Sequence, residues 1–221
     1  MTRPDAPSAR PSAGLDRVVA RSRRRIVLAT ANPDKAREIV DALAGLGLEL
    51  VARPASVPEV DETGATLLEN ARLKAEALRD ATGEDSLADD TGLEVDALGG
   101  APGVSSARYA GERATYADNV AKLVAEMAAA RRNARTARFR TVLVLAGSDG
   151  AEITVDGVVE GVIAETPSGT GGFGYDPVFV PAGGRGRTFG EMTLAEKQAL
   201  SHRGRALRAL AARLREADAS R

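Results

Sequence analysis

Two long strand-like segments dominate the second half of the sequence. Residues 136–146 and 152–165 are rich in β-branched and other apolar residues, and Ser148, Asp149 and Gly150 lie between them. Apolar runs of this kind around a short polar turn predict an antiparallel hairpin. A chain with such a hairpin must build a sheet, and the first half of the sequence indicates which kind.

Strand and helix patterns alternate in that first half. An apolar run at 25–30 is followed by a helical pattern that starts at Pro33 and stops at Gly45. Alternation that gives way to a long hairpin predicts an α/β fold with a central mixed β-sheet and flanking helices. The other expected strands are 48–52, 86–90, 93–95 and 178–180, and the other expected helices are 66–81, 115–130 and 194–216, the last interrupted near Gly204.

The composition excludes several kinds of site. The 221 residues include no cysteine and one histidine, His202, so a disulfide, a zinc–thiolate centre, a cysteine nucleophile and a histidine-rich metal site are all excluded. No apolar run approaches the roughly 20 residues that a membrane-spanning helix needs. We therefore expect no membrane partner, and the lack of cysteine fits a cytoplasmic location.

Charge separates the chain into a tail and a body. Residues 1–25 hold seven arginines and two acids, whereas the whole chain has 30 basic and 31 acidic residues. We expect a disordered basic tail at 1–24, one folded domain at 25–216 and a flexible C-terminus at 217–221. The arginine run at 21–25 would suit nucleic acid, but a solvated tail is the preferred interpretation, and no nucleic-acid partner is expected.

The junction between the first strand and the first helix is a candidate anion site. A helix N-terminus offers free backbone N–H groups and partial positive charge, which suit phosphate. The threonine and asparagine here add polar side chains and the lysine adds a full charge, although plain helix capping would explain the same residues. The segment consists of Thr30, Ala31, Asn32, Pro33, Asp34 and Lys35.

An acidic segment follows the third strand pattern. Residues 84–96 contain six acids and no base, and Asp89 and Asp90 are expected at the end of a strand, with Thr91 and Gly92 turning the chain. Neighbours in a strand point to opposite faces, so one carboxylate should face a cleft and the other should support the backbone; the pattern does not say which. With Glu62 and other upstream acids they would suit Mg²⁺, which takes oxygen ligands, while a solvated acidic loop is the alternative.

A glycine-rich segment at 169–177 forms the third constellation. It matches the spacing of a dinucleotide fingerprint by accident, since a strand rather than a helix follows it. The rings of Phe173, Tyr175 and Phe179 would either stack on a base or pack a turn into the core. No Walker A pattern occurs. Lys197, His202 and Arg203 in the last helix would suit phosphate or base edges, although His202 alone would equally be structural.

Five ordered blocks resemble the inosine-triphosphate pyrophosphatase family. They are LATANPDKAREI (28–39), DETGATLLENARLKA (61–75), LADDTGLEVDALGGAPGVSSARYAG (87–111), GTGGFGYDPVF (169–179) and EKQALSHRGRAL (196–207). The resemblance extends over about 25–214 and leaves the N-terminal tail outside. Ala31 and Thr91 stand where the family often has glycine and serine, and both changes preserve the polar character of the motifs.

The resemblance implies an activity and a set of partners. The family cleaves ITP, dITP, XTP and dXTP between the α- and β-phosphates, which gives a monophosphate and pyrophosphate and cleanses the nucleotide pool. It requires Mg²⁺, usually forms a homodimer, and has an elongated α/β body with a cleft between two lobes.

The resemblance also implies roles for particular residues. The segment from Thr30 to Lys35 would bind the triphosphate, Glu62 and Asp90 would hold Mg²⁺, and Asp90 would also act as the base toward the attacking water. Thr91 would contact substrate. The nucleobase pocket would consist of Phe173, Gly174, Tyr175, Asp176, Lys197, His202 and Arg203.

The chemistry of these residue types agrees with that assignment. Hydrolysis of a triphosphate requires neutralised phosphate charge and an activated water, which a metal and a carboxylate supply together. Donors such as Arg203 or His202 would favour the 6-oxo group of hypoxanthine or xanthine over the amino group of adenine. Two alternatives stay open: a nucleotide pyrophosphatase with another base preference, and a nucleic-acid-binding protein without enzymatic activity.

Overall fold

The computed structural model describes residues 24–131 and 134–219. Of the tail expected at 1–24, residues 1–23 lie outside the described part, and Arg24 lies within it, where it bonds Asp85 at 2.6 Å. The described chain builds a mixed sheet in the order β2-β1-β3-β5-β6-β7. The short strand β4 pairs with the C-terminal part of β3. β1 lies parallel to β2 and β3, while the pairs β3–β5, β5–β6 and β6–β7 are antiparallel, which confirms the α/β class. The strands are β1 (Arg25–Leu28), β2 (Glu49–Ala52), β3 (Asp85–Val95), β4 (Pro102–Gly103), β5 (Thr136–Ala146), β6 (Glu152–Ile163) and β7 (Phe179–Pro181).

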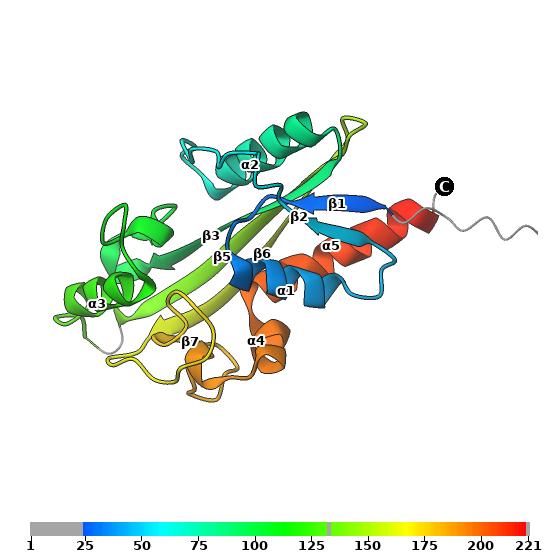
Figure 1. Cartoon of the computed structure of the whole chain (residues 1–221). Coiled ribbons are helices and arrows are strands. Elements are labelled where there is room, and N and C mark those ends of the chain that lie inside the picture. The colour runs from blue at the N-terminus through cyan, green and yellow to red at the C-terminus, as the bar shows by residue number, and fades with distance from the viewer. Residues whose placement is uncertain (1–23, 132–133, 220–221) are drawn as a thin grey trace, which may run out of the picture.

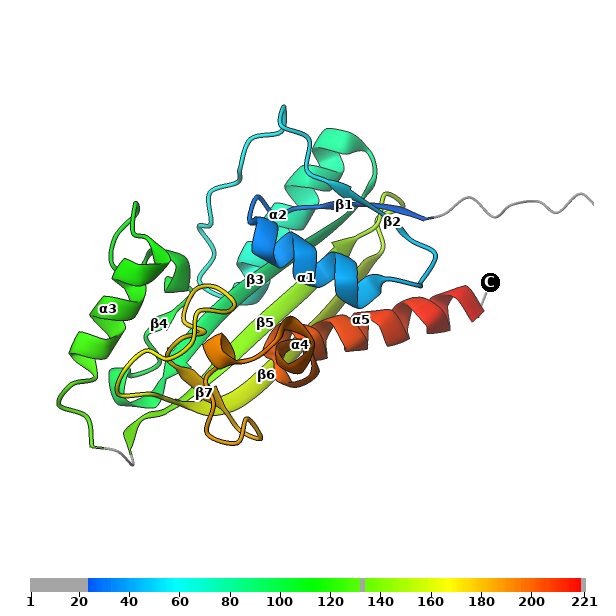
Figure 2. The same ribbon diagram turned by 60° about the horizontal axis from the view of Figure 1, so that its bottom comes forward.

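Helices cover both faces of the sheet. Figure 1 shows α2 on one side and α1 with α5 on the other, while α3 lies at the far end of the long strands. Figure 2 shows the resulting elongated outline, with α4 and β7 beside the hairpin. Within 24–131 and 134–219, every helix is too short or too polar to span a bilayer. The helices are α1 (Pro33–Leu43), α2 (Leu67–Thr82), α3 (Tyr116–Glu126), α4 (Leu194–Leu200) and α5 (His202–Ala219), which includes the start of the segment expected to be flexible.

The core follows the alternation of side chains along the strands. Leu87 and Leu143 pack against α1 and α5, whereas Ala88 and Val142 pack against α2. A third cluster, which includes Phe179, fills the end of the sheet beside α3. Both faces of the central strands are therefore buried, and a polar side chain on either face needs a partner from the layer that covers it.

Local sequence signals explain where α2 begins and ends. Thr66 and Glu69 form a reciprocal capping box at its start, and Gly83 ends it in the left-handed conformation with φ 70° and a hydrogen bond to the Arg79 carbonyl. Both ends agree with the helix predicted at 66–81.

β3 is one continuous strand, so the turn predicted at Thr91 and Gly92 is wrong. Thr91 pairs with Thr141 in the ladder to β5. Gly92 is needed for another reason: a Cβ there would lie 2.7 Å from the carbonyl oxygen of Gly103, which belongs to β4. Asp89 and Asp90 consequently lie in the middle of a strand rather than at its end.

One edge of β3 is nevertheless unpaired beside the two aspartates. β1 pairs with β3 only as far as Leu87, and β4 begins its pairing at Leu93. The backbone between them has no strand on that side. The chain leaves β1 here and enters α1, so the two aspartates lie beside a helix N-terminus.

The final helical segment breaks earlier than predicted. α4 ends at Leu200, Ser201 is extended with ψ 158°, and α5 starts at His202. Gly204, the expected break, lies inside α5, where a Cβ would approach the Gln198 carbonyl oxygen to 1.9 Å. The glycine permits α4 and α5 to pack closely and does not interrupt the helix.

Replacement of Gly92 by alanine tests the close approach of β4. The added methyl group must displace the Gly103 backbone, so the variant should lose about 1–3 kcal/mol of unfolding free energy. Urea unfolding monitored by circular dichroism measures the loss. An unchanged unfolding midpoint would contradict a packing role for this glycine.

Candidate active site

Two adjoining hollows lie beside the open edge of β3. The larger, of about 620 Å³, is lined by the β1–α1 junction, the segment after β2, α2 and the short helix η2 (Ser106–Arg108). The smaller, of about 120 Å³, is lined by the glycine-rich segment and the start of α5. They share the lining residues Asn32, Lys35, Glu62 and Ala107. The candidate anion, metal and base residues therefore meet in one continuous region.

The β1–α1 junction presents its helix end to the larger hollow. The Asn32 side chain caps α1, since its Oδ1 accepts from the backbone N–H of Asp34 at 2.9 Å and of Lys35 at 3.3 Å. Thr30, Ala31, Asn32 and Lys35 line the hollow. Pro33 and Asp34 line neither hollow and serve to start the helix. The cap therefore takes the backbone N–H groups of Asp34 and Lys35 that the sequence suggested would be free, and the junction offers the hollow its side chains and the positive end of the helix dipole instead.

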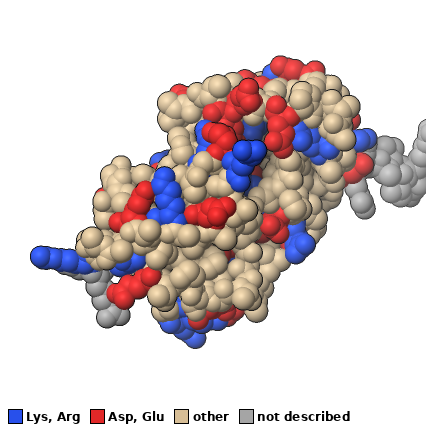
Figure 3. Space-filling view, turned by 60° about the vertical axis from the view of Figure 1, so that its left-hand side comes forward, with Lys and Arg blue, Asp and Glu red and all other residues tan. Residues whose placement is uncertain are grey.

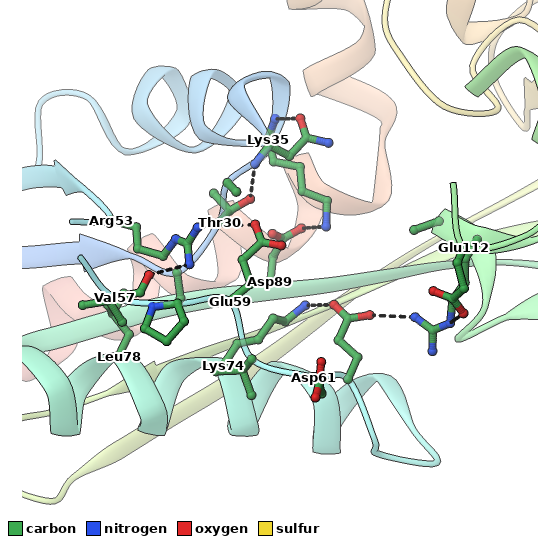
Figure 4. Close-up of a pocket in the computed structure, with 18 residues that line it drawn as sticks. Thr30, Lys35, Arg53, Val57, Glu59, Asp61, Lys74, Leu78, Asp89 and Glu112 are labelled. Atoms are coloured by element: carbon green, nitrogen blue, oxygen red, sulfur yellow. Dashed lines mark hydrogen bonds and ion pairs between the residues drawn. The ribbon is translucent and has the colours of Figure 1, made fainter. Parts of the chain in front are cut away.

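The two aspartates of β3 point to opposite faces, as strand geometry predicts. Asp89 is completely buried on the side of α1 and α5, where its Oδ2 lies 3.2 Å from Lys35 Nζ and 3.1 Å from Arg203 Nη2. Burial alone would raise the pKa of Asp89, but the charges of Lys35 and Arg203 hold it well below its ordinary value. Figure 4 shows Lys35 extending from α1 toward this carboxylate. Asp89 is therefore a permanently charged ion-pair partner.

Asp90 faces α2 and shares one lysine with Glu62. Lys74 Nζ lies 2.8 Å from Asp90 Oδ1 and 2.8 Å from Glu62 Oε1. Burial raises the pKa of Asp90 more than Lys74 lowers it, so this carboxylate is more basic than an ordinary aspartate. Burial also opposes ionisation of Glu62 and Lys74, yet Lys74 lowers the pKa of Glu62, and the charges of Asp90, Asp89 and Glu62 raise the pKa of Lys74.

Sequence reasoning missed Lys74, although a signal was present. Lys74 follows Ala71 by three residues and precedes Leu78 by four, which places it beside the apolar face of α2. A lysine at such a position must find a carboxylate on the surface that the helix covers.

The Glu62 and Asp90 pair fits a hard cation. Its oxygens already bracket the Lys74 ammonium, and Asp90 Oδ2 is buried without a hydrogen-bond partner. Among the described residues, no group of three or more His, Asp or Glu side chains is arranged to hold an ion. Two carboxylates suit Mg²⁺, which usually takes one or two from the protein and completes its shell with water and substrate phosphates.

A second charge network lies under the smaller hollow. Glu38 of α1 accepts from Lys197 Nζ at 2.7 Å and from Arg203 Nη1 at 2.6 Å. Lys197 also bonds Asp176 Oδ2 at 2.6 Å, and Arg203 Nη2 donates to Thr91 Oγ1 at 3.0 Å. Glu38 was not predicted; its place beside buried Ile39 in α1 was the available signal. The network fixes both cations against the floor of the hollow.

The glycine-rich segment divides its aromatic residues between two roles. Phe173 is half-buried, and its ring centroid lies 4.3 Å from Lys197 Nζ. Tyr175 and Phe179 belong to the core cluster, and the Tyr175 hydroxyl donates to the Ser106 carbonyl at 2.9 Å. Phe173 and Tyr175 both line the smaller hollow, and of the two only Phe173 lies outside the buried core.

Asp176 organises the loop that carries Phe173. Its Oδ2 accepts from the Phe173 backbone N–H at 2.8 Å, and burial raises the pKa of Asp176 in spite of Lys197. Gly172, with φ 70°, allows this contact because a Cβ would lie 2.0 Å from Asp176 Oδ2. Gly174 lines the smaller hollow next to Phe173.

His202 combines packing with a free polar atom. Its ring stacks on Phe139 with centroids 4.6 Å apart, and its Nδ1 has no hydrogen-bond partner although it is buried. Burial, reinforced by the charges of Arg203 and Lys197, lowers the pKa of His202 well below its ordinary value of 6.5. The imidazole is therefore neutral and lines the smaller hollow beside Phe173.

On the face drawn in Figure 3, basic and acidic side chains alternate, and neither sign forms a continuous patch. Nucleic-acid-binding surfaces concentrate lysine and arginine on one face or stripe. The described surface in this view does not have that character.

A helix N-terminus, a buried carboxylate pair and a hollow bordered by an aromatic ring, all on a mixed sheet, are typical of an α/β enzyme that acts on a nucleotide. The chain belongs to the Ham1 family, whose model matches residues 26–213. The resemblance that the five sequence blocks indicated is thereby confirmed.

Relatives of known name support this placement. The chain is 54% identical over 190 residues to a Thermus thermophilus protein named dITP/XTP pyrophosphatase, covering 84% of this chain and 89% of the relative. It is 50% identical over 186 residues to a Symbiobacterium thermophilum protein of the same name, covering 84% and 92%.

Solved structures share the fold. A HAM1 protein from Coxiella burnetii matches with a TM-score of 0.80 and 42% identity, over 87% of this chain and 99% of that one. A nucleoside-triphosphatase, or dITP/XTP pyrophosphatase, from Mycobacterium abscessus matches with a TM-score of 0.68 and 46% identity, over 84% and 98%.

The single histidine allows a direct test of its neutral state. Because the folded-state pKa of His202 lies below its unfolded value, the stability it contributes is complete above about pH 6.5 and is lost as pH falls below that value. Unfolding free energy should decrease by up to about 1.4 kcal/mol per pH unit between about pH 6.5 and 5. Denaturant titrations of the wild type and of His202→Gln at several pH values measure this decrease in unfolding free energy, and the variant should lack it.

As the one histidine of the chain, it gives a single imidazole Hε1 signal in the NMR spectrum. In the folded protein that signal should not shift between about pH 7 and 5, since the ring stays neutral. Titration with a midpoint near 6.5 would contradict the buried, neutral assignment.

Proposed function

We propose that this chain hydrolyses non-standard purine nucleoside triphosphates, namely ITP, dITP, XTP and dXTP, to the monophosphate and pyrophosphate, and so cleanses the nucleotide pool. The observation that carries the proposal is the shared wall between the helix-end hollow and the aromatic hollow, formed by Asn32, Lys35, Glu62 and Ala107. This arrangement suits a ligand with a polyanionic tail and a planar base. The names of the Thermus and Symbiobacterium relatives support the same substrates.

The triphosphate binds at the start of α1. Its roughly four negative charges meet the helix N-terminus, the polar side chains of Thr30 and Asn32, and the ammonium of Lys35. Arg53 and Arg108 also line this hollow, and Arg108 lies 3.4 Å from Glu62. Glu62 and Asp90 would hold Mg²⁺, which when bound adds positive charge at the phosphates and lowers the pKa of a water.

Asp90 accepts the proton of the attacking water. Its Oδ2 has no partner, and its raised pKa makes it a better base than an ordinary aspartate while Lys74 keeps it ionised and oriented. The water oxygen bonds to the α-phosphorus as the bond from that phosphorus to the α–β bridging oxygen breaks, and pyrophosphate departs with the bonding electron pair. Thr91, which bonds Arg203, lies next in the strand and contacts the substrate.

The base occupies the smaller hollow. Phe173 supplies a stacking face for the base. Arg203, Lys197 and neutral His202 line the same hollow and supply hydrogen-bond donors. A donor that meets the 6-oxo group of hypoxanthine or xanthine would be left facing the amino group of adenine, and a buried unpaired donor disfavours that base. Gly174, Tyr175 and Asp176 shape the slot rather than read the base.

The assembly and its location follow from the resemblance. We propose a homodimer in the cytoplasm. Sedimentation velocity should then give a mass of twice 22.9 kDa. A species at 22.9 kDa over the working concentration range would contradict the dimer.

Pyrophosphate release from dITP, XTP and dATP tests the function. With Mg²⁺, phosphate should appear only after inorganic pyrophosphatase is added, and kcat/KM for dITP and XTP should exceed that for dATP by about tenfold or more, as expected for one unpaired polar group. EDTA should abolish release.

Other outcomes would identify the alternatives. Phosphate release without the added pyrophosphatase would contradict cleavage between the α- and β-phosphates. Preference for a modified pyrimidine nucleotide would indicate another base specificity. No release from any nucleotide, with salt-sensitive binding to long DNA, would favour a nucleic-acid-binding protein.

A further inference from the structure

Tyr116 is an exposed aromatic residue at the border of the site that no motif above includes. It is the first residue of α3 and lines the smaller hollow, and 44% of its surface is exposed. Small or acidic residues suit a solvent-facing position in the first turn of a helix better than a large aromatic ring does. The presence of tyrosine at this position therefore needs an explanation.

The start of α3 is rigidly placed. Thr115 and Asp118 form a capping box, so the backbone that carries Tyr116 is fixed. One turn on, buried Asn119 accepts from the Ala110 N–H at 2.7 Å and donates to the Ala107 carbonyl at 2.9 Å. This fastens α3 to the η2 segment, which lines both hollows. The backbone of Tyr116 is therefore held in place at the border of the site.

The Tyr116 hydroxyl reaches across the border between the two hollows. It accepts a hydrogen bond from Asn32 Nδ2 at 2.7 Å. Because Asn32 Oδ1 caps α1, the amide nitrogen is the atom left to face the tyrosine. The contact joins segments that lie 84 positions apart in the chain. It connects the phosphate-binding end of α1 to the start of α3.

The Tyr116 ring covers Phe173. Their centroids lie 6.0 Å apart with planes inclined at 39°. A base between two parallel rings needs roughly 7 Å, or two contact distances of about 3.5 Å. The slot is therefore closed as the two rings now lie, and Lys197 and Arg203 already occupy positions over Phe173.

We propose that Tyr116 is a further substrate-binding residue, a gate that its bond to Asn32 holds shut and that packs on the nucleobase once the base has entered. The inference rests on the proposed function, since it concerns the base slot of that site. The hydroxyl and the ring act in opposite directions: the hydroxyl stabilises the closed state, and the ring stabilises the bound state. Asn32 also lines the larger hollow, so an effect on the phosphate tail is measured separately.

Two variants separate these effects. Tyr116→Phe retains the ring and removes the bond to Asn32, so IMP should bind about two- to tenfold more tightly, the range that one hydrogen bond represents. Tyr116→Ala removes the ring as well as the hydroxyl, so IMP should bind at least about fivefold more weakly to it than to Tyr116→Phe, as for other base-stacking residues. Titration calorimetry with IMP measures both constants, and alanine suits the first turn of a helix.

Inorganic tripolyphosphate and a second tyrosine serve as controls. Tripolyphosphate has no base, so its affinity should change by less than about twofold in both variants, and kcat for dITP should change little while KM follows the IMP affinity. Tyr109→Phe is the matched control, because Tyr109 bonds Glu126 and lines neither hollow.

Several results would overturn the proposal. IMP affinity that is not raised in Tyr116→Phe, or that is the same in Tyr116→Ala as in Tyr116→Phe, would exclude a gate whose ring and hydroxyl act in opposite directions. Equal losses for IMP and tripolyphosphate would show that Tyr116 acts only through the helix cap at Asn32. If the wild type binds IMP and hydrolyses dITP, such results reject the gate alone. If the wild type does neither, the proposed function fails and the gate fails with it.

Discussion

The site depends on two neighbouring carboxylates that point to opposite faces of one strand. A buried carboxylate is very unfavourable without a cation, so each of these two must be met by a base from the layer that covers it. Arg203 and Lys35 reach Asp89 from α5 and α1, and Lys74 reaches Asp90 from α2. The strand thus couples both helical layers to one point of the sheet, and that point is where β1 has ended and the strand edge is open.

The two carboxylates differ in what their surroundings leave free. Asp89 is completely buried, and its pKa is held far down by two cations, so it is fixed as an ion-pair partner. Asp90 has a raised pKa and an oxygen without a partner, next to the lysine that also binds Glu62. Asp89 therefore has a structural role and Asp90 a chemical one, because successive residues of a strand face different layers.

The sequence reveals those features that depend on local chemistry. The capping residues Asn32 and Thr66 and the stop at Gly83 are recognisable because each acts on its own backbone within a few residues. The opposite orientation of Asp89 and Asp90 follows in the same way from strand geometry. Gly92 and Gly204 were misinterpreted because close approach by β4 or by α4 comes from elsewhere in the chain, and a glycine looks the same whether it turns or makes room. Lys74 and Glu38 were missed because a charge on a helix face acquires meaning only when its partner on the covering layer is known.

Paired substitution of the two aspartates tests this division of roles most directly. Each substitution removes one negative charge, so the two variants can be compared directly. dITP turnover reports on the chemistry, and thermal unfolding reports on the stability of the fold. Asp90→Asn should reduce turnover by about 10²–10⁴-fold, since it removes a base, and should lower the melting temperature less than Asp89→Asn does, because Lys74 keeps Glu62 as its partner. Asp89→Asn should lower the melting temperature markedly, because loss of one partner of a buried ion pair costs about 3–5 kcal/mol. Near-normal turnover by Asp90→Asn would contradict the account.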